Sequence, residues 1–580
     1  MAEAQRAPVR LMPRRPAPAR ALDAARARAL GFHSVDPVAL PPEPDLPGRL
    51  DAAWCLSAGL LAWRRMGGAT VVLTSDPAEA RRHLGLLQAA LGEVRLAHAE
   101  PTRLARALLL AVARPLAAEA ERMSPAPESC RTLPPMGRAG LGAGLLLLAG
   151  VFAAPLAALA TLALLAGLLL VATSLLKLAA LAASLGRDAR DEGADVVPAR
   201  LPVISVLVPL FQEREVAGTL LARLAALDYP RDLLDVCLVL EDDDARTRAA
   251  LEAAALPPWA QIVAVPAGTL RTKPRALNYA LPFARGSIIG IYDAEDLPGR
   301  DHLRRVAARF ARRGPEVACL QGVLDYYNAR ANWLARCFTL EYASWFRVLL
   351  PGIARMGLVV PLGGTTLFLR RAAIEAVGGW DAHNVTEDCD LGVRLARRGF
   401  RTEIVGIATL EEANARAWPW VRQRSRWLKG YALTYASHMR DPRALLRDLG
   451  LRRFLGLQVL VGGTVLHFAL APVLWSFWLV PLGLPHPLAP ALSPPLLVAL
   501  AILFLASQVL DLGVAGLGAR RAGRGRLALW APLLQLYFPL ATLAAYRALW
   551  EAALCPFRWD KTAHGIHAPP LLLTRSLRRA

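Results

Sequence analysis

Residues 236–244 read VCLVLEDDD, and this stretch decides the fold of the central part of the chain. A short, unbroken apolar run is typical of a strand buried on both faces of a parallel sheet, and this run ends in carboxylates. Residues 287–296, SIIGIYDAED, repeat the pattern, and residues 204–208 form a third apolar run. Helical stretches such as residues 215–227 lie between the runs. The alternation predicts βαβ units and a mostly parallel, Rossmann-like α/β sheet within residues 200–440.

The two acidic strand ends are expected to converge, because ligands bind at the carboxyl ends of strands in open parallel sheets. Bare carboxylates would repel a diphosphate, so we expect a hard divalent cation, Mg²⁺ or Mn²⁺, between them. The second cluster is the expected metal site, with the candidates Asp293, Glu295 and Asp296. The first cluster is expected to meet the base and ribose of a nucleotide, with the binding candidates Glu241, Asp242, Lys273 and Glu213. The alternative is that both clusters, and the basic loop around Lys273, are merely solvated surface loops.

A third acidic motif, Thr386-Glu387-Asp388, precedes a predicted helix over residues 390–398. An ionised carboxylate is favoured near the N-terminus of a helix. Asp388 is therefore a candidate general base that deprotonates an acceptor hydroxyl, with Thr386 and Glu387 in the same catalytic set. The alternative is that Thr386 or Asp388 simply caps the helix.

The run QRSRW occupies residues 423–427. On a helix, Gln423, Arg426 and Trp427 share one face. An arginine there can stabilise charge that develops on a leaving diphosphate, and Trp427 can stack on a sugar ring. Arg424 belongs to the same candidate set for contact with acceptor and diphosphate. The alternative is a belt of aromatic and cationic residues beside a membrane.

Composition points to a bilayer. The 580 residues are 55% hydrophobic and carry a formal net charge of +21. Long apolar stretches accompany the arginines, which favours contact with anionic lipid over nucleic acid. Residues 139–186 contain one charged residue, Lys177, and predict two transmembrane helices with both ends in the cytoplasm. Residues 454–550 predict two or three more, the last of which, 527–546, either crosses or forms a re-entrant or interfacial segment.

The remaining parts of the chain carry no clear chemistry. Residues 1–31 are expected to form a disordered basic arm, residues 32–125 a small α/β regulatory or docking domain, and residues 551–580 a basic tail. The seven cysteines are scattered and include no C-x-x-C pair. This spacing argues against disulfides and zinc and fits a reducing compartment.

Taken in order, the motifs resemble those of the processive membrane β-glycosyltransferases of glycosyltransferase family 2, which include cellulose, chitin and hyaluronan synthases. The resemblance covers residues 200–440 and the flanking apolar spans. It implies a nucleotide-binding GT-A fold and inversion at the anomeric carbon. It also implies that Asp388 is the base and that Asp293 and Glu295 lie at the metal. The residues implied at the acceptor and diphosphate are Gln423, Arg426 and Trp427.

Three further segments support this resemblance. Gln321 and residues 363–366 look like the acceptor-side and interface segments of the family. Residues 559–565 resemble a tail motif of bacterial exopolysaccharide members. Residues 32–125 are similar to the N-terminal domain of type II secretion ATPases, which implies a regulatory or docking role.

Two departures from the family pattern concern the acidic motifs. Glu241-Asp242 stands where the family usually has Asp-Asp. The metal motif reads Asp-Ala-Glu-Asp instead of a strict D-x-D, so Glu295 and Asp296 compete for the second ligand position. Both departures keep a carboxylate at the position.

The sequence thus predicts a membrane hexosyltransferase with a cytoplasmic catalytic domain, and the resemblance implies that the membrane is a bacterial inner membrane. We expect it to polymerise a sugar from a UDP-sugar, UDP-glucose first, into a β-linked exopolysaccharide coupled to export. The expected partners are the nucleotide sugar, the growing glycan, membrane lipids and a regulatory or export partner of residues 32–125, without nucleic acid. One alternative is a transferase of single sugars to polyprenyl phosphate, and another is a non-catalytic nucleotide-binding membrane scaffold.

Overall fold

The computed structural model describes residues 31–134, 136–186, 198, 200–212, 217–254, 256–480, 482–488 and 493–558. Glu213, almost all of the basic arm, the tail motif at 559–565 and the rest of the basic tail lie outside these residues. The chain divides into two compact units, which are described separately. The first holds residues up to 123, 202–221 and 230–294, and the second holds 124–201, 222–229 and the residues from 295 onward.

The first unit begins with a small α/β domain. Its sheet has the order β1-β2-β3, formed by Leu60–Met66, Ala69–Thr74 and Val94–His98. Strands β1 and β2 are antiparallel, whereas β2 and β3 are parallel. The domain ends in the long helix α5, Pro101–Arg122, whose N-cap Glu100 accepts hydrogen bonds from the amides of Thr102 and Arg103. Such side-chain caps satisfy amides that a helix leaves without an internal partner.

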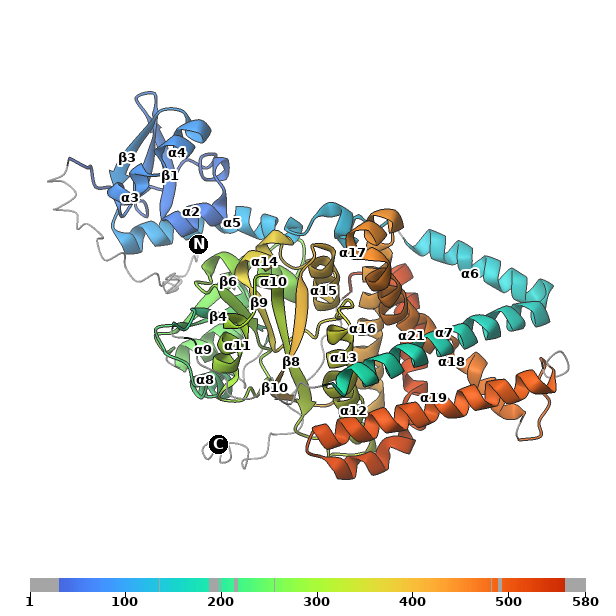
Figure 1. Ribbon diagram of the computed structural model, residues 1–580. Coiled ribbons are helices and arrows are strands. Elements are labelled where there is room, and N and C mark those ends of the chain that lie inside the picture. The colour runs from blue at the N-terminus through green and yellow to red at the C-terminus, as the bar shows by residue number, and fades with distance from the viewer. Residues whose placement is uncertain are drawn as a thin grey trace. The chain divides into compact units, whose positions relative to one another are not determined.

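Figure 1 shows the strands of the α/β region, which pair in the order β7-β4-β5-β6 in the first unit and β10-β8-β9 in the second. The pairs β4–β5, β4–β7, β5–β6 and β8–β10 are parallel, and β8–β9 is antiparallel. Every residue of β5 is buried, as expected for a strand covered on both faces. The first unit contributes β4 (Ile204–Leu210), β5 (Leu234–Glu241), β6 (Ala260–Val265) and β7 (Ile288–Ile291), and the second contributes β8 (Val317–Tyr326), β9 (Leu367–Arg370) and β10 (Arg401–Glu411).

The helices that carry functional motifs belong to both units. In the first unit they are α9 (Ala245–Ala253) and α10 (Lys273–Ala280). In the second unit they are α12 (Trp333–Ser344), α15 (Glu387–Arg397) and α16 (Ala417–His438). Residues 389–396 of helix α15 are all buried, and its first turn is acidic, which is the favoured charge at a helix N-terminus.

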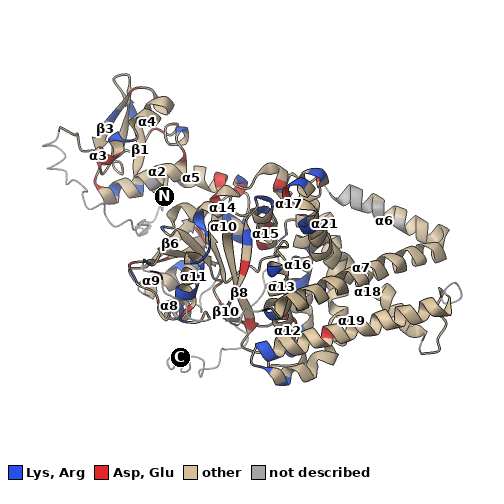
Figure 2. Ribbon diagram, in the orientation of Figure 1, with Lys and Arg blue, Asp and Glu red and all other residues tan. Residues whose placement is uncertain are grey.

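Three helices among the described residues are long and apolar enough to cross a membrane. They are α7 (Pro155–Ser184), residues 442–479 and α19 (Pro494–Arg521). Figure 2 shows α7 and α19 almost without charged residues along their length. Residues 525–554 form a bent pair with an angle of 46° that counts as a fourth span if it crosses as one. Helix α6 (Met136–Ala153) ends and α7 begins at Ala154, within the stretch that was predicted to form two helices.

An ion pair joins two of these apolar helices. Lys177 Nζ on α7 lies 2.6 Å from Asp511 Oδ1 on α19. Charges within an apolar span are expensive and are generally paired with one another. The architecture as a whole confirms the predicted class, an α/β domain with apolar helices and a small N-terminal α/β domain.

Candidate active site

In the first unit, helix α10 connects the two acidic strand ends. Lys273 Nζ lies 2.5 Å from Asp293 Oδ1, just after β7. Two residues further on, Arg275 Nη1 lies 3.3 Å from Glu241 Oε2, at the end of β5. Only β4 separates β5 from β7, so the two ends are about 10 Å apart at a strand spacing of about 4.8 Å. One turn of helix therefore presents a cation to each acidic strand end, and Glu241, Lys273 and Asp293 share one edge of the sheet.

Glu241 is a buried carboxylate with a cation beside it. Its side chain is 8% exposed. Burial raises the pKa of Glu241 above its ordinary value, and the charges of Arg275 and Arg271 oppose that rise. The carboxylate therefore lies in an environment where an additional hydrogen-bond donor from a ligand would be favourable.

The three aspartates after Glu241 differ in their surroundings. Asp242 is 54% exposed and pairs with Arg248, and Asp243 pairs with Arg271. Asp244 is buried and caps α9, accepting from the backbone amide and the hydroxyl of Thr247. Asp242 is thus exposed at the carboxyl end of β5, whereas Asp244 has a structural role at the start of α9.

The expected metal ligands do not form a three-carboxylate cluster. Among the described residues, no three His, Cys, Asp or Glu side chains are arranged to hold a metal ion. In the second unit, the buried Asp296 accepts a hydrogen bond from Thr365, and the backbone carbonyl of Glu295 accepts one from Arg223. Asp296 is therefore engaged by the loop before β9. Magnesium in nucleotide sites needs only one or two carboxylates beside the phosphates, and the cation-paired, 30% exposed Asp293 fits that requirement.

In the second unit, the Thr-Glu-Asp motif begins helix α15. Thr386 is the N-cap residue, but none of the described amides of the first turn donates to its hydroxyl. The side-chain capping proposed as an alternative for Thr386 is therefore not observed. Glu387 is buried, whereas Asp388 is half-buried in the first turn and accepts from the amide of Cys389 at 2.7 Å. The helix starts three residues earlier than predicted, which places Asp388 where the helix dipole favours its ionised form.

The loop before α15 is seated on helix α16. Arg426 Nη1 donates to the carbonyl of Val385 at 3.4 Å. One turn later, a Cβ atom on Gly430 would lie 2.1 Å from Thr386 Oγ1, so this close approach requires glycine. Asn384 Nδ2 donates to Thr434 Oγ1 at 2.9 Å. Within one unit, the structure thus brings together the Thr-Glu-Asp motif and the helix of the Q-x-x-R-W motif.

The other residues of the Q-x-x-R-W motif have different surroundings. Gln423 Oε1 accepts from Asn414 Nδ2 at 2.9 Å. The ring of Trp427 lies 6.3 Å from that of Tyr342 on α12. Arg424 pairs with Glu341, also on α12, at 2.5 Å and lies over the ring of Trp427. Arg424 therefore ties α16 to α12 through a charge and aromatic faces.

A buried ionic network lies on the other side of α15. Asp390 Oδ2 lies 2.7 Å from Arg394 Nε, and its Oδ1 lies 3.1 Å from His438 Nε2 on α16. The side chains of Asp390 and Arg394 are both 0% exposed. Burial by itself would raise the pKa of Asp390, but Arg394 and His438 hold it below its ordinary value. The sequence analysis did not predict this pair, although the i, i+4 spacing of Asp390 and Arg394 on a predicted helix is typical of an ion pair.

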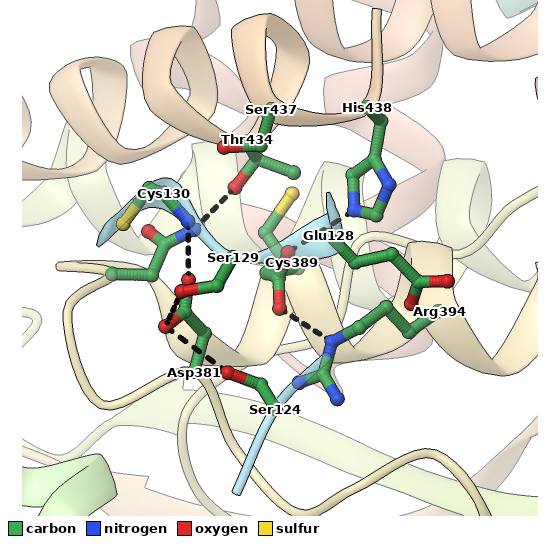
Figure 3. Close-up of polar contacts among 12 residues, drawn as sticks. Ser124, Glu128, Ser129, Cys130, Asp381, Cys389, Arg394, Thr434, Ser437 and His438 are labelled. Atoms are coloured by element: carbon green, nitrogen blue, oxygen red, sulfur yellow. Dashed lines mark hydrogen bonds and ion pairs between the residues drawn. The ribbon is translucent and has the colours of Figure 1, made fainter. Parts of the chain in front are cut away.

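Residues 124–134, which precede the first apolar helix, form hydrogen bonds with the turn upstream of α15. Figure 3 shows Asp381 accepting hydrogen bonds from Ser124, Ser129 and Cys130. The hydroxyl of Ser129 and the amide of Cys130 both lie 2.8 Å from its carboxylate oxygens. Asp381 belongs to the Gly-Gly-Trp-Asp turn upstream of α15. This segment carries no recognisable motif, so sequence reasoning did not predict that it packs there.

Two parts of the chain match models of known protein families. Residues 202–430 match the family model described as "Glycosyltransferase like family 2". Residues 29–119 match the model described as "MshEN domain". The first match includes both acidic strand ends, the Thr-Glu-Asp motif and most of α16.

Individual relatives cover part of the chain. A beta-monoglucosyldiacylglycerol synthase of Synechocystis is 32% identical over 46% of this chain and 56% of its own length. The cellulose synthase 1 catalytic subunit of Komagataeibacter xylinus is 27% identical over 40% of this chain and 31% of its own. A solved mannosyltransferase from Pyrobaculum calidifontis, in complex with GDP-Man and Mn²⁺, is 21% identical with a TM-score of 0.44, covering 67% of this chain and 99% of its own. The chain spans about half the length, or less, of these curated relatives.

Proposed function

We propose that this chain transfers a sugar from a nucleotide sugar with inversion at the anomeric carbon, because residues 202–430 match the glycosyltransferase family 2 model. One observation carries this proposal. In a single compact unit, the loop of the Thr-Glu-Asp motif is held by Arg426 and by the close contact at Gly430 of α16. A candidate base and a candidate leaving-group cation therefore come from adjoining segments, as a displacement reaction requires.

The proposed reaction begins at Asp388. Its carboxylate takes the proton of an acceptor hydroxyl as that oxygen attacks the anomeric carbon of the sugar. The bond between that carbon and the diphosphate oxygen breaks, and the electron pair leaves with the nucleoside diphosphate. Arg426 stabilises the negative charge on the leaving group, and Trp427 stacks on the acceptor sugar. Attack opposite the leaving group converts an α-linked donor into a β-linked product.

We propose that the nucleotide binds to the first unit, at the carboxyl ends of β5 and β7 beside α10, which we call the nucleotide edge. We propose that Glu241 and Asp242 meet the base and ribose and that Lys273 contributes positive charge near the phosphates. Asp293 would hold a divalent cation, Mg²⁺ or Mn²⁺, which offsets the negative charge of the diphosphate when bound. The support for this assignment is the position of both strand ends along one turn of α10.

Two acceptors are in question. The first is a growing glycan, so that repeated transfer gives a β-linked polymer, with UDP-glucose as the expected donor. The second is a lipid, favoured by the 32% identical relative whose name states that it makes a monoglucosyl lipid. A polyprenyl phosphate is a further lipid acceptor of the same kind. The three apolar helices support a reaction beside a membrane for either acceptor, and we propose a bacterial inner membrane with the domain in the cytoplasm.

The deciding experiment incubates the purified full chain, in lipid nanodiscs, with Mg²⁺ or Mn²⁺ and a panel of radiolabelled nucleotide sugars. Parallel reactions contain diacylglycerol, polyprenyl phosphate or an oligosaccharide. A ladder of water-soluble products indicates a polymerase, and one labelled, solvent-extractable product indicates a glycolipid synthase. If the wild-type chain gives neither a labelled product nor donor hydrolysis with any nucleotide sugar, the protein is a nucleotide-binding scaffold. If Asp388→Asn forms product at the wild-type rate, Asp388 is not the base.

A further inference from the structure

Helix α5 of the N-terminal domain ends on the nucleotide edge of the same unit. In its last turn, Glu121 accepts hydrogen bonds from the amides of Thr269 and Leu270 at 2.8 and 3.3 Å. The hydroxyl of Thr269 donates to the second oxygen of Glu121 at 2.6 Å. One residue before, the carbonyl of Ala120 accepts from Asn278 of α10 at 2.9 Å. The helix end therefore fixes the loop that leads from β6 into α10.

Glu121 also shares a buried guanidinium with Glu241. Arg275 is 0% exposed and lies between the two carboxylates. Its Nε is 3.1 Å from Glu121 Oε1, a charge contact rather than an aligned hydrogen bond, and its Nη1 is 3.3 Å from Glu241 Oε2. The carbonyl of Pro266 accepts a further hydrogen bond from Arg275. The guanidinium is thus positioned jointly by the N-terminal domain and by the end of β5.

This arrangement has a physical consequence for Glu241. A buried guanidinium is stable only while its charge and N–H groups are matched, and two carboxylates compete for this one. Loss of Glu121 removes one competitor and releases the loop of Thr269. Arg275 then moves toward Glu241, and the carboxylate that faces the nucleotide changes both its orientation and its capacity to accept a new donor.

We propose that Glu121 is a positioning residue of the nucleotide site: through Arg275 it sets the placement of Glu241, so that the domain ending in α5 controls the affinity for the donor nucleotide. The inference rests on the proposed function in that Glu241 contacts the nucleotide. It adds a specific link, from residue 121 to the strand end, by which events in the N-terminal domain reach the catalytic domain.

The test compares three variants of the full chain in nanodiscs. Glu121→Ala removes both the charge and the hydrogen-bond acceptors, whereas Glu121→Gln keeps acceptors for the Thr269 and Leu270 amides. Glu119→Gln is the matched control, an exposed carboxylate two residues earlier on the same helix. We expect Glu121→Ala to raise the KM for the nucleotide sugar about 10-fold with kcat within about twofold, and Glu121→Gln to raise it about threefold. The control keeps wild-type values.

Hydrogen exchange followed by mass spectrometry provides the second measurement, without a requirement for turnover. In Glu121→Ala, exchange is expected to rise both in the loop at 266–272 and in the strand end at 241–244. Equal KM values in all variants, with wild-type exchange at 241–244, would overturn the proposal. So would a fall in kcat with unchanged KM, because that pattern indicates general structural damage.

The two proposals fail in distinguishable ways. If the wild-type chain binds no nucleotide by calorimetry with UDP, the proposed function fails, and exchange at 241–244 alone decides the link to Glu121. If Glu121→Ala does not fold, the same readouts on Glu121→Gln decide it, since that variant retains the loop hydrogen bonds.

Discussion

The two halves of the catalytic region hold their carboxylates in different ways. On the nucleotide edge, Asp293 and Glu241 each have a cation from α10, and Asp293 remains partly exposed. Around α15, by contrast, Asp390 and Asp381 are fully buried, and each receives two or more partners from separate segments. The first arrangement pairs one partly exposed and one buried carboxylate with a cation each, and the second fixes the position of a helix.

This difference suggests that the two regions have different roles in the proposed reaction. A partly exposed ion pair has little net stability, so its partner is readily exchanged for a ligand. A fully satisfied buried network is rigid, because any change leaves a polar group unmatched in a low dielectric. We infer that the nucleotide edge adjusts to the donor, whereas the network behind α15 holds Asp388 in place.

The largest expected effect is on turnover by Asp388. The substitution Asp388→Asn keeps the size of the side chain and removes its capacity to take a proton. We expect kcat to fall by about 10²–10⁴-fold, with the KM for the nucleotide sugar within about threefold. Steady-state kinetics with labelled donor measures both, and Glu375→Gln, on an exposed carboxylate of the same unit, is the control. A kcat within tenfold of wild type would remove Asp388 from the role of base.

Next in size is the stability of the network behind α15. Asp390→Asn leaves Arg394 as a buried charge without its carboxylate, which costs about 3–5 kcal/mol in unfolding free energy. Thermal and urea unfolding in detergent measure the loss. The exposed pair of Asp228 and Arg304 provides the contrast, because Asp228→Asn is expected to change stability by less than about 1 kcal/mol. Equal effects of the two substitutions would contradict the claim that the buried network behind α15 contributes more stability than an exposed ion pair of the same unit.

A smaller effect is expected at the metal candidate on the nucleotide edge. Asp293→Asn removes a carboxylate charge but leaves Lys273 in place. We expect the concentration of Mn²⁺ or Mg²⁺ for half-maximal activity to rise about 10-fold, with unchanged folding. Titration of activity with each metal, alongside Asp243→Asn as an exposed control, measures the shift. An unchanged metal requirement would mean that Asp293 does not bind the metal and only forms an ion pair with Lys273.

Local pattern was enough to predict three of the seven strands of the α/β region, β4, β5 and β7, and the acidic ends of β5 and β7. The predicted strands at 236–240 and 287–292 correspond to β5 and β7, because continuous apolar runs and the carboxylates that end them are adjacent in sequence. The helix after the Thr-Glu-Asp motif was also predicted, although it starts at Glu387 instead of Asp390. Helix ends depend on fine geometry and are the least certain part of such a prediction.

Contacts between residues that are far apart in the sequence could not be predicted from local sequence patterns. The amide of Thr269 meets Glu121 across 148 residues, and Arg424 meets Glu341 across 83. Arg424 shares its motif with Arg426, so sequence alone assigned both to the substrate. Only the fold shows that the first lies among aromatic rings of α12 and the second at the loop before α15. Which face a charged side chain takes is decided by tertiary packing, which leaves no local signal.

The pH dependence of stability provides the finest test of the comparison. Burial raises the pKa of Glu241 despite Arg275, whereas Arg394 and His438 keep the pKa of Asp390 low despite burial. A carboxyl group whose pKa is raised on folding, such as Glu241, stabilises the folded state at pH values below its unfolded-state pKa of about 4.3. This stabilisation is lost as the pH rises through its folded-state pKa. A carboxyl group whose pKa is lowered on folding, such as Asp390, stabilises the folded state at pH values above its unfolded-state pKa of about 3.9. This stabilisation is lost as the pH falls through its folded-state pKa.

The two halves are therefore expected to respond to pH with opposite signs. Relative to wild type, Glu241→Gln gains stability as the pH rises above about 4.3, since the variant no longer buries a charge. Asp390→Asn is most destabilised at neutral pH, and its deficit shrinks as the pH falls below about 3.9. Urea unfolding of both variants and wild type between about pH 3 and pH 7 measures the two differences. Parallel curves would mean that the carboxylates of the two halves are held alike, and the proposed division between an adjustable donor edge and a rigid base platform would be lost.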